Sequence, residues 1–201
     1  MTSRAFRVVE MFEEALAEYA GSPWAVVTDS CTTAIFLSLL LEGVEGRRVS
    51  VPARTYVSVP FAVIRAGGVP RFVNTDWLGD YRMEPTRVVD SALRLSKGMW
   101  RPGELRCVSF HARKRLPIGR GGAILLEDPH DAWRLRQLRF DGRVGTVPYT
   151  QDSIDELGYN AYMTPEQAAR GLQLLENLPD NPPDLDPGYP DVRKFPYPWP
   201  R

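Results

Sequence analysis

The sequence predicts an α/β protein of three layers, in which a mainly parallel sheet of about five strands carries helices on both faces. From residue 24 to residue 74, short apolar runs alternate with segments of helical periodicity, in the order strand, helix, strand, helix, strand. This alternation is typical of parallel sheets, because a parallel connection needs a crossover helix. The chain has 201 residues, 43% of them hydrophobic, which is enough for one buried core.

Each expected element rests on a local pattern. The N-terminal segment is helical because Phe6, Val9, Phe12 and Leu16 recur at helical spacing. The last helix should begin after Thr164, with a proline in its first turn. The expected helices cover residues 4–19, 34–42, 58–66, 82–95, 131–139 and 165–178, and the expected strands cover residues 24–27, 48–52, 69–74, 107–110 and 122–127.

The chain divides into a folded domain at residues 1–178 and a tail at residues 179–201. The tail contains eight prolines, so it should be extended rather than helical. Two interpretations of it stay open. It is a loose end, or its aromatic side chains, such as Tyr189 and Trp199, pack across a neighbouring subunit.

Composition narrows the function classes. The 25 acidic and 25 basic residues balance, which gives no electrostatic reason to expect nucleic acid or an anionic membrane as a partner. Cys31 and Cys107 lie far apart in apolar surroundings, and the two histidines, His111 and His130, form no pattern of metal ligands. We therefore expect a reduced, cytoplasmic protein without a metal site or a membrane span.

One lysine stands between two apolar runs, at residues 105–110 and 122–126. The chain has only three lysines against twenty-two arginines, so Lys114 at this turn suggests a need for an amine. An amine can condense with an aldehyde, whereas a guanidinium cannot. The alternative is that Lys114 is a solvated loop charge.

A second candidate site is the turn at residues 29–33, between a strand and a helix. Ser30, Cys31, Thr32 and Thr33 place hydroxyls and free backbone amides at the positive end of the helix dipole, where a phosphate can bind. Ordinary helix capping explains the same residues.

Several segments together resemble the DegT/StrS family of sugar aminotransferases, which use pyridoxal 5'-phosphate (PLP) and have the aspartate aminotransferase fold (fold type I). The resemblance covers most of residues 6–178 in the family's order. It rests on the segments at residues 12–19, 29–34, 51–56, 67–76, 109–122, 138–142 and 157–169.

The resemblance implies a role for each matching residue. Lys114 would form the aldimine with PLP and later move a proton. Tyr56 would stack on the pyridine ring, and Asn160 would reach the phosphate of a neighbouring subunit, which implies a homodimer. The residues that would hold the phosphate are Ser30, Cys31, Thr32 and Ser109, and the weaker candidates for substrate contacts are His111 and Tyr162.

The chain also departs from the family pattern. The Glu-Asp-x-Ala-Gln segment, whose aspartate pairs with the pyridine nitrogen in the family, is expected to be lacking between residues 76 and 107. The family's C-terminal domain is expected to be reduced to the proline-rich tail. Asp80 and Asp90 lie in this interval, but neither is expected to follow an apolar strand. The strand ending at Phe110 should instead pair with the strand ending at Val51 and close a reduced sheet.

The sequence therefore predicts a PLP-dependent aminotransferase-like protein. It would transfer an amino group from a donor to a keto-sugar or related carbonyl compound through a Lys114 aldimine. The alternative, from another class, is a non-catalytic member that acts as a dimeric binding or regulatory partner.

Overall fold

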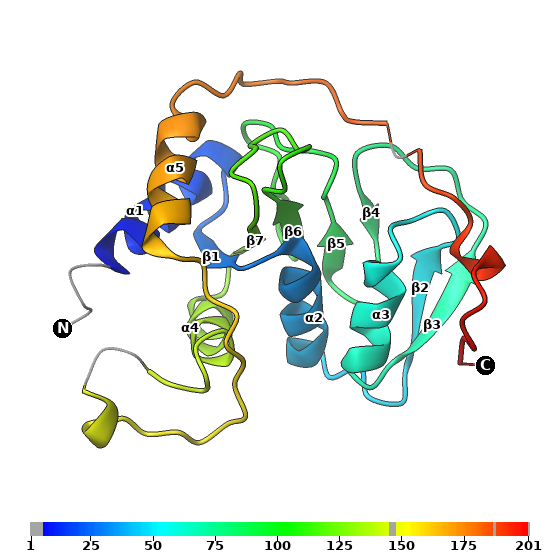
Figure 1. Ribbon diagram of the computed structural model, residues 1–201, viewed down its shortest axis with the longest axis horizontal. Helices are drawn as coiled ribbons and strands as arrows, with labels where there is room; N and C mark the ends of the chain where they lie inside the picture. Colours follow the sequence, from blue (N-terminus) through cyan, green and yellow to red (C-terminus); the bar gives the residue numbers. More distant parts are fainter. Residues whose placement is uncertain (1–5, 145–147, 187, 201) are drawn as a thin grey trace.

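The computed structural model describes residues 6–144, 148–186 and 188–200 and has a mixed sheet at its centre (Figure 1). Five strands lie in the order β1-β7-β6-β5-β4, and β2 and β3 form a separate parallel pair. The strands are β1 (Trp24–Thr28), β2 (Arg48–Pro52), β3 (Val69–Val73), β4 (Tyr81–Arg82), β5 (Val88–Asp90), β6 (Leu105–Ser109) and β7 (Gly122–Leu126).

The sheet is mostly antiparallel, so the prediction of a mainly parallel sheet is wrong. Only β5 and β6 pair in parallel within the five strands, whereas β1 with β7, β6 with β7, and β4 with β5 are antiparallel. The parallel unit read from the sequence is β2 and β3, connected by a helix. It adjoins β4 through the Ser50 N–H, which donates to the Glu84 carbonyl at 2.7 Å.

Residues 82–95 are not the predicted helix. They contain the turn between β4 and β5, the whole of β5, and the bend after it. Pro85 has no N–H and disfavours a helix interior, and the β-branched pair Val88 and Val89 favours a strand. As a result β6 pairs with β5, and the predicted pairing of β6 with β2 is also wrong.

Helices cover both faces of the sheet, because the strand side chains alternate between two cores. On β1, Val26 packs with α2 (Cys31–Leu41), α3 (Ser58–Arg65) and α4 (Pro129–Leu138). Its neighbour Val27 packs with α1 (Arg7–Ala20) and α5 (Pro165–Leu175) on the opposite face. The predicted start of α1 at residues 4–5 lies outside the described residues. The three-layer arrangement follows from the two-residue period of the strands.

The tail runs from α5 past one end of the strands to α3 and β3, as Figure 1 shows in orange to red. Trp199 stacks on Phe61 of α3 at 5.4 Å between ring centroids and contacts Phe72 of β3 at 5.1 Å. Trp199 of the tail therefore packs on its own chain. Among the described residues, no helix combines the length and apolar character needed to cross a membrane.

Candidate active site

Lys114 lies in the hairpin loop that joins β6 to β7. The Lys114 N–H donates to the His111 carbonyl at 2.8 Å, and a bridge between His111 and Gly119 closes the base of the loop. The side chain is half-buried, and burial is the main cause that lowers the pKa of its amine below the ordinary lysine value. A larger fraction of this amine is therefore neutral near neutral pH than in a solvated lysine.

A cavity of about 640 Å³ collects seven of the residues that the sequence singled out. They come from α2, from the loop after β2 and from the β6–β7 hairpin, which are far apart in the sequence. These residues are Ser30, Cys31, Thr32, Tyr56, Ser109, His111 and Lys114.

The first turn of α2 forms one wall of the cavity. Ser30 is its N-cap, and its Oγ accepts a hydrogen bond from the Thr33 N–H at 3.2 Å. The hydroxyls of Thr32 and Ser58 lie 2.8 Å apart. Because the first amides of a helix have no acceptor within it, this turn offers N–H groups and a hydroxyl to an anion.

Gly122 explains how β7 comes so close to α2. A Cβ atom at this position would lie 2.4 Å from the Cys31 nitrogen, so any larger residue would push the helix away. Ser109 pairs with Gly122 across the β6–β7 ladder, which places Ser109 beside the same helix end. The glycine therefore allows the hairpin and the helix to share one site.

Asp90 also lines the cavity, although it was not among the site residues predicted from the sequence. It is the last residue of β5, and its buried carboxylate accepts hydrogen bonds from the Tyr81 hydroxyl at 2.7 Å and the Ala92 N–H at 2.9 Å. Burial raises the pKa of this carboxyl. The expectation that Asp90 follows no apolar strand is wrong, because Val88 and Val89 precede it in β5. These two apolar, β-branched residues could have indicated the strand, but the segment was predicted to be a helix.

A short chain of hydroxyls fixes the position of the carboxylate. The Tyr81 phenol donates its hydrogen to Asp90, so Thr55 donates to the phenol oxygen across 2.8 Å. Both hydroxyl residues are buried. Asp90 therefore presents its charge to the cavity from a rigid support.

Aromatic rings form the outer wall. Tyr56 is 55% exposed, and its ring centroid lies 6.0 Å from that of Tyr189 in the tail. Trp77 stacks on Tyr189 at 6.3 Å. No pattern in the sequence indicated that Trp77 and Tyr189 would line the same cavity as Lys114.

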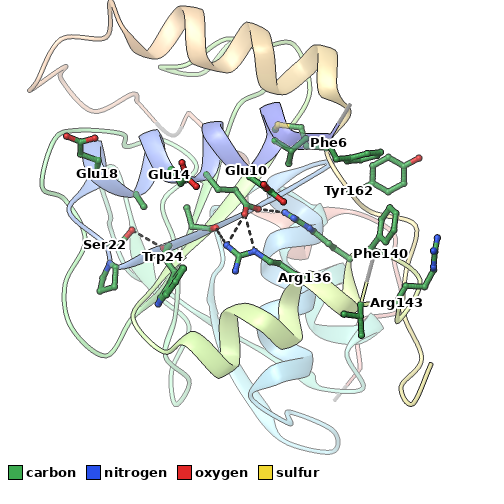
Figure 2. Close-up of a pocket in the computed structure, with 18 of the residues that line it drawn as sticks. Phe6, Glu10, Glu14, Glu18, Ser22, Trp24, Arg136, Phe140, Arg143 and Tyr162 are labelled. Atoms are coloured by element: carbon green, nitrogen blue, oxygen red, sulfur yellow. Dashed lines mark hydrogen bonds and ion pairs between the residues drawn. The ribbon is translucent and has the colours of Figure 1, made fainter. Parts of the chain in front are cut away.

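Two predicted site residues lie outside this cavity. Tyr162 lines a separate groove of about 1000 Å³ between α1 and α4, where Figure 2 shows it beside Phe6 and Phe140. This packing does not bring Tyr162 to the substrate contact predicted for it. Asn160 is exposed, and its amide donates to Asp141 at 3.3 Å.

Comparison with known proteins agrees with this architecture. The DegT/DnrJ/EryC1/StrS aminotransferase family matches residues 3–91 and 97–182. The GDP-perosamine synthase of Caulobacter vibrioides is 26% identical over 87% of this chain, and the chain spans 58% of that protein.

Two solved structures show the same fold. AtS13 from Actinomadura melliaura has a TM-score of 0.73, with 24% identity over 86% of this chain and 60% of its own. The PLP form of Spr1654 from Streptococcus pneumoniae has a TM-score of 0.71, with 22% identity over 85% of this chain and 59% of its own. With most of its residues matched in order, the chain belongs to the DegT/DnrJ/EryC1/StrS aminotransferase family.

Proposed function

We propose that this protein is a PLP-dependent aminotransferase that moves an amino group from an amino donor to a keto-sugar or a related carbonyl compound. The observation that carries the proposal is the juxtaposition of Lys114 and Asp90. An amine with a lowered pKa and a buried carboxylate line the same cavity, beside the first turn of α2.

The residues of the cavity fit PLP by their chemistry. The amine of Lys114 suits the cofactor aldehyde, and the first turn of α2 suits the phosphate. The carboxylate of Asp90 is costly to keep ionised without a cation, because it is buried. A protonated pyridine nitrogen would supply that cation, and Tyr56 offers an aromatic face to the ring.

PLP, when bound, supplies an aldehyde for the donor's amino group and a ring that stabilises negative charge at the reacting carbon. The protein's residues do the rest. With PLP bound, Lys114 would take the proton from the donor's α-carbon onto its amine and would return it at the carbon that carried the cofactor's aldehyde, for which a lowered pKa is an advantage. Asp90 would keep the ring nitrogen protonated through its negative charge.

The acceptor and the assembly are part of the same proposal. A carbonyl sugar is favoured because the relative of 26% identity is a GDP-perosamine synthase, although the chain spans only 58% of it. Asn160 is exposed and outside its own chain's cavity, in agreement with a role across a homodimer. A second subunit would then complete the phosphate site.

The test is a half-reaction with the amino donor alone. Protein loaded with PLP is mixed with each of a panel of L-amino acids, including L-glutamate, and the released 2-oxo acid is measured. The proposal predicts about one equivalent of 2-oxo acid per bound PLP, and none from Lys114→Ala. Asp90→Asn should slow release by about a hundredfold or more, the loss typical of removing one charge-stabilising group. If the unaltered protein binds PLP but releases no 2-oxo acid from any donor, the proposal fails.

A further inference from the structure

The tail is fixed on both sides of Tyr189 by contacts with the folded domain. Before it, the Leu185 N–H donates to the Leu93 carbonyl at 3.0 Å. After it, the buried Val192 donates its N–H to the Ala53 carbonyl at 2.9 Å. The backbone is therefore held on both sides of Tyr189, whose side chain lines the cavity.

An ion pair also holds the tail to the folded domain. Asp184 of the tail accepts from Arg94 through both carboxylate oxygens, with the Nε contact at 2.9 Å. Arg94 also contacts Asp80 at 2.7 Å. This ion-pair cluster ties the tail to the segment that follows β5, next to Asp90.

Tyr189 contacts the amine that the proposed reaction requires. Lys114 Nζ donates to the Tyr189 hydroxyl oxygen at 3.3 Å and lies 6.0 Å from the centre of the ring. Among the residues that the structure describes, Tyr189 is the only side chain that hydrogen bonds to this amine, and none forms an ion pair with it. The flexible lysine stem thus has one directional contact to fix its end.

We propose that Tyr189 is a positioning residue, which orients the Lys114 amine by accepting its hydrogen bond and closes the cavity over it. The proposal rests on the use of Lys114 described above. It assigns the proline-rich tail a part in the site: the backbone anchors hold the ring, and the ring and hydroxyl hold the amine.

The electrostatic surroundings of the amine define the test. The groups around Nζ are Cys31 of α2, Asp90 of β5, Arg113 of the same loop and Tyr189 of the tail. Burial lowers the pKa of Lys114, whereas a hydrogen bond to the phenol oxygen favours the charged amine. The ring and the hydroxyl of Tyr189 therefore act on this pKa in opposite directions.

The experiment measures the acylation rate of each lysine against pH, without PLP, by peptide mass spectrometry. The other two lysines, Lys97 and Lys194, are exposed and serve as internal controls. In Tyr189→Phe the ring still covers Lys114 but the acceptor is lost, so labelling at neutral pH should rise about two- to tenfold and its midpoint should move to lower pH. Tyr189→Ala removes the ring as well as the acceptor, so its midpoint should lie at higher pH than that of Tyr189→Phe.

The outcomes separate this inference from the proposed function. Unchanged midpoints at Lys114 in both variants would overturn the positioning role, whatever the protein does with PLP.

A PLP titration by absorbance adds a second readout, in which both variants should bind PLP more weakly than the unaltered protein. Tighter binding in Tyr189→Ala would overturn the inference as well, because the tail would then obstruct the cavity. If the unaltered protein takes up no PLP, the proposed function fails while the labelling result still stands.

Discussion

At the scale of single residues, Asp90 carries an electrostatic cost that its proposed function explains. Burial raises the pKa of the carboxyl above its ordinary 3.8, so the ionised form is less stable in the folded chain than in the unfolded chain. Without PLP, the ionised Asp90 lowers the free energy of unfolding by its full amount above the folded-state pKa. The effect vanishes below about 3.8, the ordinary pKa of an aspartate. Stability from this group is therefore lost as pH rises through that window.

We predict that Asp90→Asn stabilises the protein without PLP while weakening PLP binding. At pH 7 the gain should be about 1 kcal/mol, or about 2–4 °C in the melting temperature for a chain of this size. The gain should shrink as pH falls towards 4, where the unaltered carboxyl becomes neutral. Asp76→Asn, at an exposed position, is the matched control and should change neither quantity. A destabilised Asp90→Asn at pH 7 would show that the ionised carboxylate is a structural requirement.

At the scale of elements, Glu13 joins three parts of the fold in one buried contact. It lies on α1, and its Oε1 accepts the Val27 N–H of β1 at 2.9 Å. Its Oε2 accepts from Arg136 of α4 at 2.9 Å, and Arg139 also contacts the carboxylate. Figure 2 shows Arg136 directed into the groove between α1 and α4 that Tyr162 also lines.

Replacing that carboxylate should destabilise the fold. Glu13→Gln keeps an acceptor for Val27 but leaves two arginines without their negative partner, so we expect a loss of about 3 kcal/mol. The urea midpoint of unfolding measures it. Glu14→Gln is the control, since the Glu14 side chain is 68% exposed, and it should stay within about 0.5 kcal/mol. Equal midpoints for the two variants would contradict the anchoring role.

The length of each helix or strand decided whether it could be predicted from the sequence. The helix periodicity of α1 and α5 and the apolar runs of β1 to β3, β6 and β7 were visible in the sequence, because each is long enough to show its period. The strands β4 and β5 have two and three residues, too few for a two-residue period to appear. Because β5 was not predicted, Asp90 was not assigned to the site, and β6 was expected to pair with β2 instead of β5. The place of Tyr189 could not be predicted because it depends on tertiary anchors far along the chain.

At the scale of the whole molecule, the proposed homodimer makes a prediction about Asn160. The native mass from light scattering should be twice 22.7 kDa. Asn160→Ala should weaken PLP binding about tenfold, the loss of one hydrogen bond to a charged phosphate. Asn177→Ala, at an exposed position after α5, is the control. A monomeric protein whose PLP affinity is the same with and without the Asn160→Ala change would contradict a phosphate site shared between two subunits.

Whether PLP forms a Schiff base with Lys114 is measured by trapping with borohydride, followed by peptide mass spectrometry. With only three lysines in the chain, each attachment site is resolved. If Lys114 holds the cofactor, we expect stoichiometric reduced pyridoxyl label on Lys114, loss of the near-ultraviolet to visible absorption band on reduction, and neither signal in Lys114→Ala. Label spread over Lys97 and Lys194, or no label at saturating PLP, would contradict it.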